Sequence, residues 1–398
     1  MKVTLSTIIL SIVALLSSME CRGEVQEGTD SVTSSIEISL LTCEPHPAIY
    51  SLYGHTAIRV QDFRKGTDIA VNYGVFDFNA PNFLLRFIFG RTDYSMGIVP
   101  FNLFCMEYQS YGSGVIEQVL NLTDKEKEKI IAALQHNYLP GNREYRYNYF
   151  YDNCTTRARD ILLNNLERQL IPLPQSDSVK TYRSMIHAHN ADYPWARWGN
   201  DILLGFQADQ NTTVSERQFL PRNLSGDFDR MELLNADGSR VPLVSKRFYI
   251  VNPGVQEQEN GFPFRPSTCA LLFLLLTAVV TVLEFILKRW LWLYDTILMI
   301  LTGLSGIVLT MMLFSSHPTV SLNLQILVLN PLTLIFAYAV TRKAIRHELH
   351  WWWKAWTSLI VFFLVGRFLQ CYAEGMMILA LCLLIRCISR FMLKKRLI

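Results

Sequence analysis

The segment Asp152-Asn153-Cys154-Thr155-Thr156-Arg157 places a cysteine where an amphipathic helix is expected to begin. Unsatisfied amides and the positive dipole end of a helix N-terminus stabilise a thiolate. About a hundred residues earlier, Tyr53-Gly54-His55-Thr56 places a histidine at the head of an alternating, strand-like stretch. A thiolate nucleophile needs a positioned base. We therefore predict a thiol site with Cys154 as nucleophile and His55 as base.

The imidazole of His55 needs a third side chain to orient it. A turn near Lys65-Gly66 predicts a hairpin that pairs the His55 strand with a second alternating stretch, residues 69–78. In this hairpin His55 lies across from about residues 75–76. We predict Asp77 as the orienting residue, Asn72 as the alternative and Tyr73 as a third candidate. A slip of one residue reverses the face of a strand, so the choice stays open.

Length and composition limit the classes of function. The 398-residue chain has a net charge of +3, and no basic groove interleaved with aromatic residues lies outside its hydrophobic region, so we expect no nucleic-acid partner. The predicted thiol chemistry calls for no metal and no cofactor. Half of the residues are hydrophobic, but they are unevenly distributed: residues 30–262 have the composition of a soluble protein, whereas Leu, Ile, Val, Phe and Trp dominate from about residue 268.

The N-terminus combines a charged start, Met1-Lys2, with an apolar run at residues 5–16 and the small pair Ser17-Ser18. This pattern is typical of a secretory signal peptide, which we assign to residues 1–20. An uncleaved anchor helix is the alternative. Lipidation of Cys21 is disfavoured, because Met and Glu precede it where a lipobox has small residues.

The eight cysteines do not form a disulfide framework. Four lie in or beside hydrophobic stretches, where cysteine behaves as a small apolar residue: Cys269, Cys371, Cys382 and Cys387. Cys43, Cys105 and Cys154 lie in the part expected to be exported, and this odd number leaves at least one free thiol. A bridge between Cys43 and Cys105 stays open as an option.

Residues 36–262 mix strand and helix signals, which predicts an α+β periplasmic domain that carries the thiol site. Residues 36–41 and 49–60 are expected as strands. Thr123 and Glu126 form a capping box that opens a helix, and the cysteine helix is predicted over residues 155–166.

Five hydrophobic segments follow and predict an all-α transmembrane domain over residues 268–392. They cover residues 268–287, 291–314, 322–340, 355–370 and 374–392. If the soluble domain lies outside, lysine and arginine gather at the inner ends of these segments, as the positive-inside rule requires. The outer loops carry neither. Residues 393–398 then form a cytoplasmic tail.

Charged residues within hydrophobic segments are costly and need partners. Glu284, Asp295 and Arg386 lie near inner ends, where we expect them to pair or snorkel. Three further residues lie towards the outer face: Arg367, His317 and Glu374. They either pair structurally or hold a lipid phosphate.

Four groups of residues together resemble the Lnb family, lipoprotein N-acyltransferases of the Bacteroidetes type. They are Leu41-Thr42-Cys43, residues 50–60 (YSLYGHTAIRV), Asn72-Tyr73-Gly74 with Phe76-Asp77-Phe78, and residues 152–157 (DNCTTR). A histidine strand followed by a cysteine helix also resembles a circularly permuted NlpC/P60-like, papain-like fold. The resemblance covers residues 36–250 in motif and the remainder in architecture. One departure is Glu44-Pro45-His46, which stands where a glycine-rich turn is expected.

The resemblance implies a multi-pass protein of the bacterial inner membrane, with its N-terminal domain in the periplasm and its C-terminus in the cytoplasm. It implies an acyltransferase whose partners are a phospholipid donor and a lipoprotein acceptor. The Cys154 thiolate would take an acyl chain as a thioester, with His55 as base, and pass it to the α-amino group of a diacylglyceryl-cysteine. Backbone amides at the start of the cysteine helix would stabilise the oxyanion.

Two other classes of function remain open. A membrane-anchored cysteine peptidase or amidase acting on cell-wall peptide would use the same Cys154–His55 pair with water or an amine as acceptor. The aromatic stretch at residues 145–151 argues against the polar groove that such an enzyme needs. A non-enzymatic membrane assembly module would make the thiol incidental, and Cys154→Ala would leave its function intact.

Overall fold

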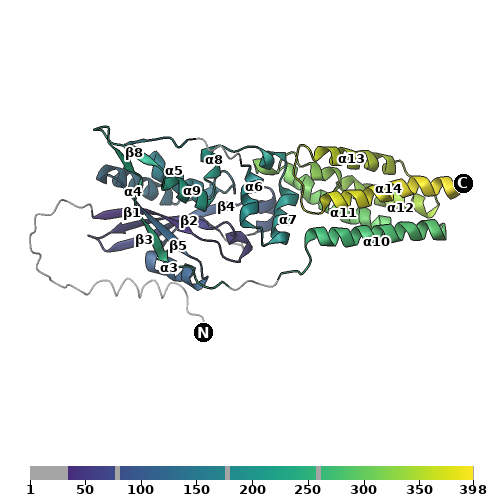
Figure 1. The fold of residues 1–398 in the computed structure, drawn as a ribbon, viewed down its shortest axis with the longest axis horizontal. Coiled ribbons are helices and arrows are strands. Elements are labelled where there is room, and N and C mark those ends of the chain that lie inside the picture. Colours follow the sequence, from purple (N-terminus) through teal and green to yellow (C-terminus); the bar gives the residue numbers. More distant parts are fainter. Residues whose placement is uncertain (1–34, 77–80, 175–179, 257–260, 398) are drawn as a thin grey trace, which may run out of the picture. The chain divides into compact units, whose positions relative to one another are not determined.

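The structure is a computed structural model and describes residues 35–76, 81–174, 180–256 and 261–397. A sheet-rich α/β region is followed by a helical region (Figure 1). The predicted signal peptide, Cys21 and Asp77 lie outside the described residues.

A seven-stranded antiparallel sheet forms the centre of the N-terminal region, with strand order β10-β5-β1-β2-β3-β4-β6. Its strands are β1 (Ile36–Cys43), β2 (His55–Asp62), β3 (Thr67–Val75), β4 (Asp93–Pro100), β5 (Val115–Leu120), β6 (Glu144–Arg146) and β10 (Val244–Val251). The predicted strand over residues 49–60 begins only at His55, because Ile49–Ser51 form a short 3-10 helix, η1.

Different helices cover the two faces of this sheet. They are α3 (Phe101–Ser110) on one face and α4 (Asp124–Tyr138), α5 (Cys154–Asn164) and α9 (Pro221–Phe228) on the other (Figure 1). Successive side chains of a strand point to opposite faces. Leu40 and Ile58 therefore belong to the core under α4 and α5, whereas Leu41 and Ala57 belong to the core under α3. The apolar central strands are buried on both sides.

Shorter elements complete this region. They are α2 (Phe83–Ile88), α6 (Tyr182–His189), α7 (Pro194–Leu203), η2 (Phe206–Asp209), α8 (Val214–Arg217) and a small sheet of β7 (Gln169–Leu170), β8 (Glu232–Leu234) and β9 (Arg240–Pro242). The capping box predicted from Thr123 and Glu126 is confirmed at the start of α4: each of the two side chains accepts a hydrogen bond from the other residue's backbone amide.

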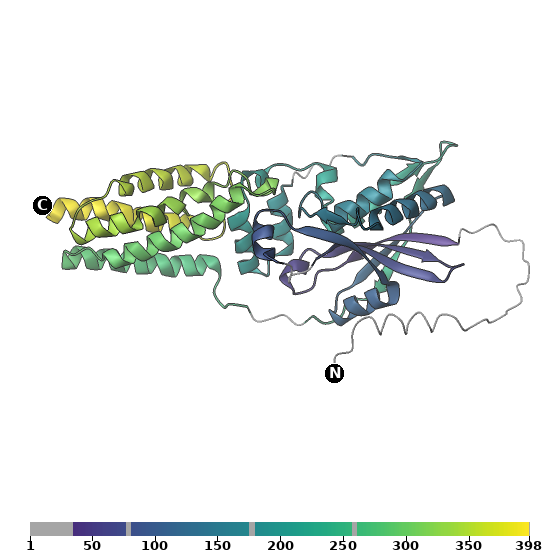
Figure 2. The ribbon, with the colours of Figure 1, turned by 180° about the vertical axis from the view of Figure 1, so that it is seen from behind.

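The C-terminal region is helical. It contains α10 (Pro266–Leu287), α11 (Trp292–Leu313), η3 (Pro318–Val320), η4 (Leu324–Leu327), α12 (Pro331–Ile345), α13 (Trp352–Gly366) and α14 (Met376–Leu397), which Figure 2 shows from behind. Four stretches of the described chain are long and apolar enough to cross a membrane: Pro266–Leu287, Trp292–Leu313, Pro318–Ile345 and Met376–Lys394. The remaining predicted span corresponds to α13, an apolar helix of 15 residues. The count of five spans therefore stays a prediction.

Four fully or almost fully buried charges tie α10, α11 and α14 together. Arg386 contacts Asp295 at 2.8 Å and Glu284 at 2.9 Å. Arg390 contacts Glu284 at 2.7 Å and also pairs with Asp295. Two carboxylates thus face two guanidinium groups, so this buried cluster of four side chains carries no net charge. The expected pairing is confirmed, with Arg390 as an additional partner.

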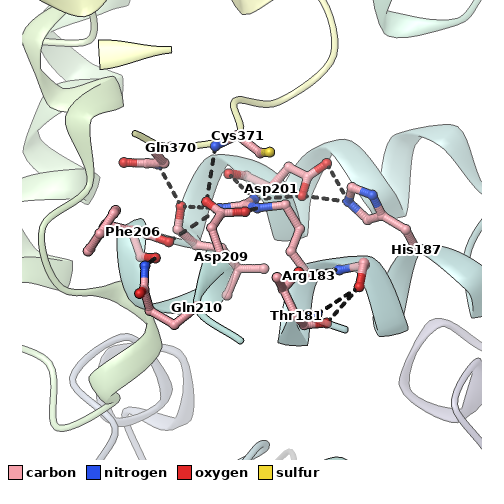
Figure 3. A network of polar contacts seen from close by, with 12 residues as sticks. Thr181, Arg183, His187, Asp201, Phe206, Asp209, Gln210, Gln370 and Cys371 are labelled. Atoms are coloured by element: carbon pink, nitrogen blue, oxygen red, sulfur yellow. Dashed lines mark hydrogen bonds and ion pairs between the residues drawn. The ribbon is translucent and has the colours of Figure 1, made fainter. Parts of the chain in front are cut away.

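A second polar network joins the two regions, which belong to one compact unit of the chain. Buried Arg183 on α6 donates to Asp201 of α7 at 2.7 Å and to Asp209 of η2 at 2.8 Å (Figure 3). Asp209 also accepts from the backbone amide of Cys371, and Gln370 donates to the carbonyl of Leu204, which links these elements to the stretch before α14. The network gives the buried guanidinium of Arg183 two carboxylate partners. It also holds α7 beside the helical region.

Substitution of Gly54 tests the backbone path that leads into β2. The φ of this glycine is +78°, and a Cβ added there would lie 2.5 Å from the carbonyl oxygen of Cys43. We expect Gly54→Ala to lower the free energy of unfolding by about 2–4 kcal/mol, because it adds both a strained backbone and a clash. Thermal unfolding of the purified protein measures this effect. Gly141→Ala, at a site with open space around the glycine and no positive φ, is the control. Equal midpoints for the two variants would contradict the described path.

Candidate active site

Cys154 is the first residue of α5, and the residue before it fixes its position. The Asn153 side chain caps the helix: its Oδ1 accepts from the backbone amides of Thr155 and Thr156, both at 2.9 Å. Its Nδ2 donates to two backbone carbonyls, so all of its polar atoms are used. The Cys154 backbone is thereby held in place, while its side chain stays partly exposed.

His55 is the first residue of β2 and lies opposite Cys43 of β1. The glycine before it permits the close approach to the Cys43 carbonyl described above. On the other side, the Tyr53 hydroxyl accepts hydrogen bonds from Asn200 at 2.6 Å and Asn190 at 3.2 Å. The entry to β2 is therefore anchored to α7, the helix of the polar network.

The structure brings the His55 imidazole and the Cys154 thiol close enough for each to shift the pKa of the other. Burial is the largest single influence on the thiol and opposes its ionisation, and the charge of His55 is the strongest influence in the other direction. Hydrogen bonds from His55, the Thr56 backbone and the Thr155 hydroxyl add to this effect, and together they lower the pKa of Cys154 to about 7. Burial also disfavours the charged imidazole, yet the charge and hydrogen bond of Cys154 raise the pKa of His55. Both shifts favour a thiolate–imidazolium pair near neutral pH.

Asn72 is the predicted orienting candidate that contacts the His55 ring. It pairs with Ala57 on the neighbouring strand, two residues from His55, and so lies on the same face. Its Oδ1 is 3.1 Å from Nε2 of His55. An amide oxygen only accepts, so Nε2 carries the proton and Nδ1 is the nitrogen left to take a proton from the thiol.

The predicted register of this hairpin is wrong by one to two residues. The ladder closes at Asp62 and Thr67 and pairs Ala57 with Asn72, whereas the predicted register pairs Ala57 with residue 73 or 74. The turn is therefore centred slightly earlier than the Lys65-Gly66 signal suggests. Tyr73 points to the other face, where its hydroxyl accepts from Asn137 at 3.0 Å.

Tyrosine rings form a wall beside the nucleophile. A Cβ added at Gly74, whose φ is +90°, would lie 3.8 Å from Cβ of Cys154, 3.6 Å from the Tyr147 ring and 3.9 Å from the Tyr145 hydroxyl. The Tyr147 ring packs on that of Tyr94, with 4.2 Å between centroids. Glycine at position 74 thus leaves room where the Cys154 side chain and this aromatic wall meet.

The expectation that backbone amides at the start of the cysteine helix stabilise an oxyanion is wrong for two of these amides. Thr155 and Thr156 donate their amides to the Asn153 cap, so they do not point freely towards a substrate. Among the first amides of α5, that of Cys154 itself is the remaining candidate. A site that stabilises an oxyanion therefore needs a donor from elsewhere in the domain.

The other sequence-predicted groups lie apart from this constellation. The seven described cysteines are free thiols, so the Cys43–Cys105 option is not realised. In the described parts of the chain, no cluster of His, Cys, Asp and Glu is arranged to hold a metal ion. Three residues of the outer face have separate partners: His317 with Phe87, Arg367 with Cys371, and Glu374 with Ser267. No contact between described residues joins these three into one phosphate site.

The chain combines apolar helices long enough to cross a membrane with a sheet-rich domain. In that domain Cys154, His55 and Asn72 form a candidate thiol–imidazole–amide site. A model of the Lnb N-terminal periplasmic domain matches residues 29–188, which include Cys154, His55 and Asn72. A model of the Lnb transmembrane domain matches residues 257–397. The chain therefore belongs to the Lnb family, as the sequence motifs suggest, and is an inner-membrane protein with a periplasmic N-terminal domain. Neither a curated protein nor a solved structure matches the chain.

The ion pair gives a measurable pH dependence. Alkylation of Cys154 by iodoacetamide, followed by mass spectrometry of its peptide, should rise with pH through a midpoint near 7. Loss of the charge and hydrogen bond in His55→Ala leaves burial as the main influence and raises the thiol pKa. The rate at pH 7 should then fall roughly 10- to 50-fold, because the thiolate is the reactive form.

Asn142→Ala, which removes a side chain bonded to His136 on the surface, is the matched control. It should leave the pH dependence of Cys154 alkylation unchanged. A midpoint that stays near 7 in His55→Ala would show that the imidazole does not ionise the thiol.

Proposed function

We propose that this protein is a lipoprotein N-acyltransferase. It would move an acyl chain from a phospholipid, through a thioester on Cys154, to the α-amino group of a diacylglyceryl-cysteine. The observation that carries this proposal is the partly exposed Cys154–His55–Asn72 constellation in a domain joined to apolar helices. Membership of the Lnb family supports it.

In the first half-reaction the Cys154 thiolate attacks the ester carbonyl carbon of the phospholipid. The carbonyl electron pair moves to oxygen and forms a tetrahedral oxyanion. When this intermediate collapses, the lysophospholipid alkoxide leaves and takes the proton held on Nδ1 of His55. The acyl group stays on sulfur, and the imidazole is left neutral, with its ring held by Asn72.

In the second half-reaction the acceptor amine attacks the thioester. Neutral His55 removes a proton from the amine as the new C–N bond forms. Cleavage of the C–S bond returns the thiolate, which is stabilised by the imidazolium that results. The products are an N-acylated, triacylated lipoprotein and the original ion pair, so the same two residues serve both halves.

The surroundings of the site favour lipid substrates over cell-wall peptide. Exposed apolar side chains flank both strand ends at the site: Ile49 and Tyr50 before Gly54, and Val75 after Gly74. Near α2, whose Leu85 and Phe87 are also exposed, the Phe89 carbonyl accepts a hydrogen bond from Ser316, in the stretch that follows α11. An apolar surface bonded to the helical region suits an acyl chain better than a polar peptide.

The same proposal includes a topology. We place five spans, with α13 as the short one, the sheet-rich domain outside and the C-terminus in the cytoplasm. The positive charges at the inner loop ends support this orientation. The lipid donor would then lie in the outer leaflet, next to the domain that carries Cys154.

The intact mass of a reporter lipoprotein's N-terminal lipopeptide tests the reaction. Cells that lack this protein should carry diacylated reporter, and wild type should restore the third acyl chain. Cys154→Ala and His55→Ala should not restore it, because the first removes the nucleophile and the second its base. Asn72→Ala should restore it partially, since the imidazole is present but poorly oriented.

Cys105→Ala is the control, because it removes an exported cysteine that is not part of the constellation, and it should behave as wild type. Triacylated reporter in every strain would contradict the transferase and favour the peptidase or amidase. Full rescue by Cys154→Ala would leave only a non-enzymatic role.

A further inference from the structure

The hydroxyl of Tyr145 is a buried polar group without a hydrogen-bond partner among the described residues. Its residue is 7% exposed, and removing a hydroxyl from water without compensation is costly. Buried groups of this kind need a reason, and one reason is a ligand that supplies the missing partner. Here the hydroxyl lies beside the candidate nucleophile.

Two atoms define the position of this hydroxyl relative to Cys154. A Cβ placed on Gly74 would be 3.9 Å from the Tyr145 oxygen and 3.8 Å from Cβ of Cys154. The hydroxyl and the Cys154 side chain therefore both border the position that a side chain at residue 74 would fill. We expect the carbonyl of a substrate attacked by Cys154 to come within reach of this hydroxyl.

The Tyr145 ring is held rigidly. The Arg157 guanidinium lies over it at 3.5 Å from the ring centroid, and Asp152 fixes that guanidinium through two hydrogen bonds at 2.6 and 2.8 Å. The ring also packs edge-on against Tyr73. A cation on the ring face draws electron density from the phenol and makes its O–H a better donor.

The hydroxyl remains protonated at working pH. Burial raises the pKa of Tyr145 far above its ordinary value, and the negative charge of Cys154 raises it further, against the smaller opposing effect of Arg157. A phenol that keeps its proton can donate a hydrogen bond to a negatively charged oxygen, but it cannot act as a base.

We propose that Tyr145 is a further catalytic residue, whose hydroxyl donates a hydrogen bond to the acyl oxygen when Cys154 attacks. This inference rests on the proposed thiol chemistry. It supplies the donor that the capped amides of Thr155 and Thr156 cannot, with the Cys154 amide as the second donor. The acceptor is the acyl oxygen of an ester or thioester, so the same hydroxyl serves both half-reactions.

The step balances without any transfer of the phenolic proton. The thiolate forms the S–C bond as the C=O π electrons move to oxygen, and the Tyr145 O–H donates to that oxygen. Collapse reforms C=O and expels the leaving group, which is protonated by His55. Tyr145 then releases the neutral carbonyl unchanged.

Tyr145→Phe tests this inference in the purified full-length protein. The assay uses dioleoyl phosphatidylethanolamine as donor and a synthetic diacylglyceryl-cysteine peptide as acceptor. We expect kcat to fall about 10²- to 10³-fold, as for loss of one oxyanion donor, with little change in KM. The midpoint of Cys154 alkylation should stay near pH 7, and the thermal midpoint should not fall, because only an unpaired buried hydroxyl is removed.

Tyr73→Phe is the matched control. It keeps the ring that touches Tyr145 and removes only a hydroxyl whose oxygen is bonded to Asn137 of α4, so it should keep wild-type kcat. Tyr145→3-fluorotyrosine keeps the hydroxyl and should retain activity. Wild-type kcat in Tyr145→Phe would overturn the inference about Tyr145 and leave the proposed function standing. Loss of activity in Tyr145→3-fluorotyrosine with normal Cys154 alkylation would do the same. Wild-type kcat in Cys154→Ala would overturn the proposed function itself.

Discussion

The contact between the Cys154 sulfur and the His55 ring is the interaction on which the rest of the candidate site depends. It joins the first residue of a helix to the first residue of a central strand, so it requires α5 and the sheet to pack in a single arrangement. The glycines at positions 54 and 74 leave space where a backbone or the thiol must come close. Asn153 fixes the start of the helix, and Asn72 fixes the ring.

A chain of polar contacts runs from this pair towards the helical region. Tyr53, two residues before His55, is bonded to Asn200 of α7. The next residue, Asp201, is bonded to Arg183 (Figure 3). The backbone carbonyl of Asp201 accepts a hydrogen bond from Gln325 in η4. Such buried networks restrict relative movement, because every broken contact leaves an unsatisfied charge or dipole. These contacts tie the start of the strand that carries His55, through α7, to the helical region.

Local signals in the sequence predicted much of this arrangement, and long-range packing explains what they missed. The Thr123–Glu126 capping box and the paired intramembrane charges follow from neighbouring residues or from chemistry that must be satisfied. The Asn153 cap could also have been predicted, since Asn is a preferred N-cap. The register that brings Asn72 to His55 depends on where the hairpin closes, which composition does not determine. Nothing near Tyr145 in the sequence predicts that its hydroxyl is buried beside Cys154, because β6 and β3 come together only through β4.

The most direct test of the central claim is the intact mass of the purified protein after incubation with phospholipid and no acceptor. We predict an added mass of one acyl chain, located on the peptide that contains Cys154 and removed by neutral hydroxylamine, as a thioester requires. His55→Ala should accumulate this adduct far more slowly. Transfer to an added acceptor without any Cys154 adduct, or an adduct on another residue, would contradict the account.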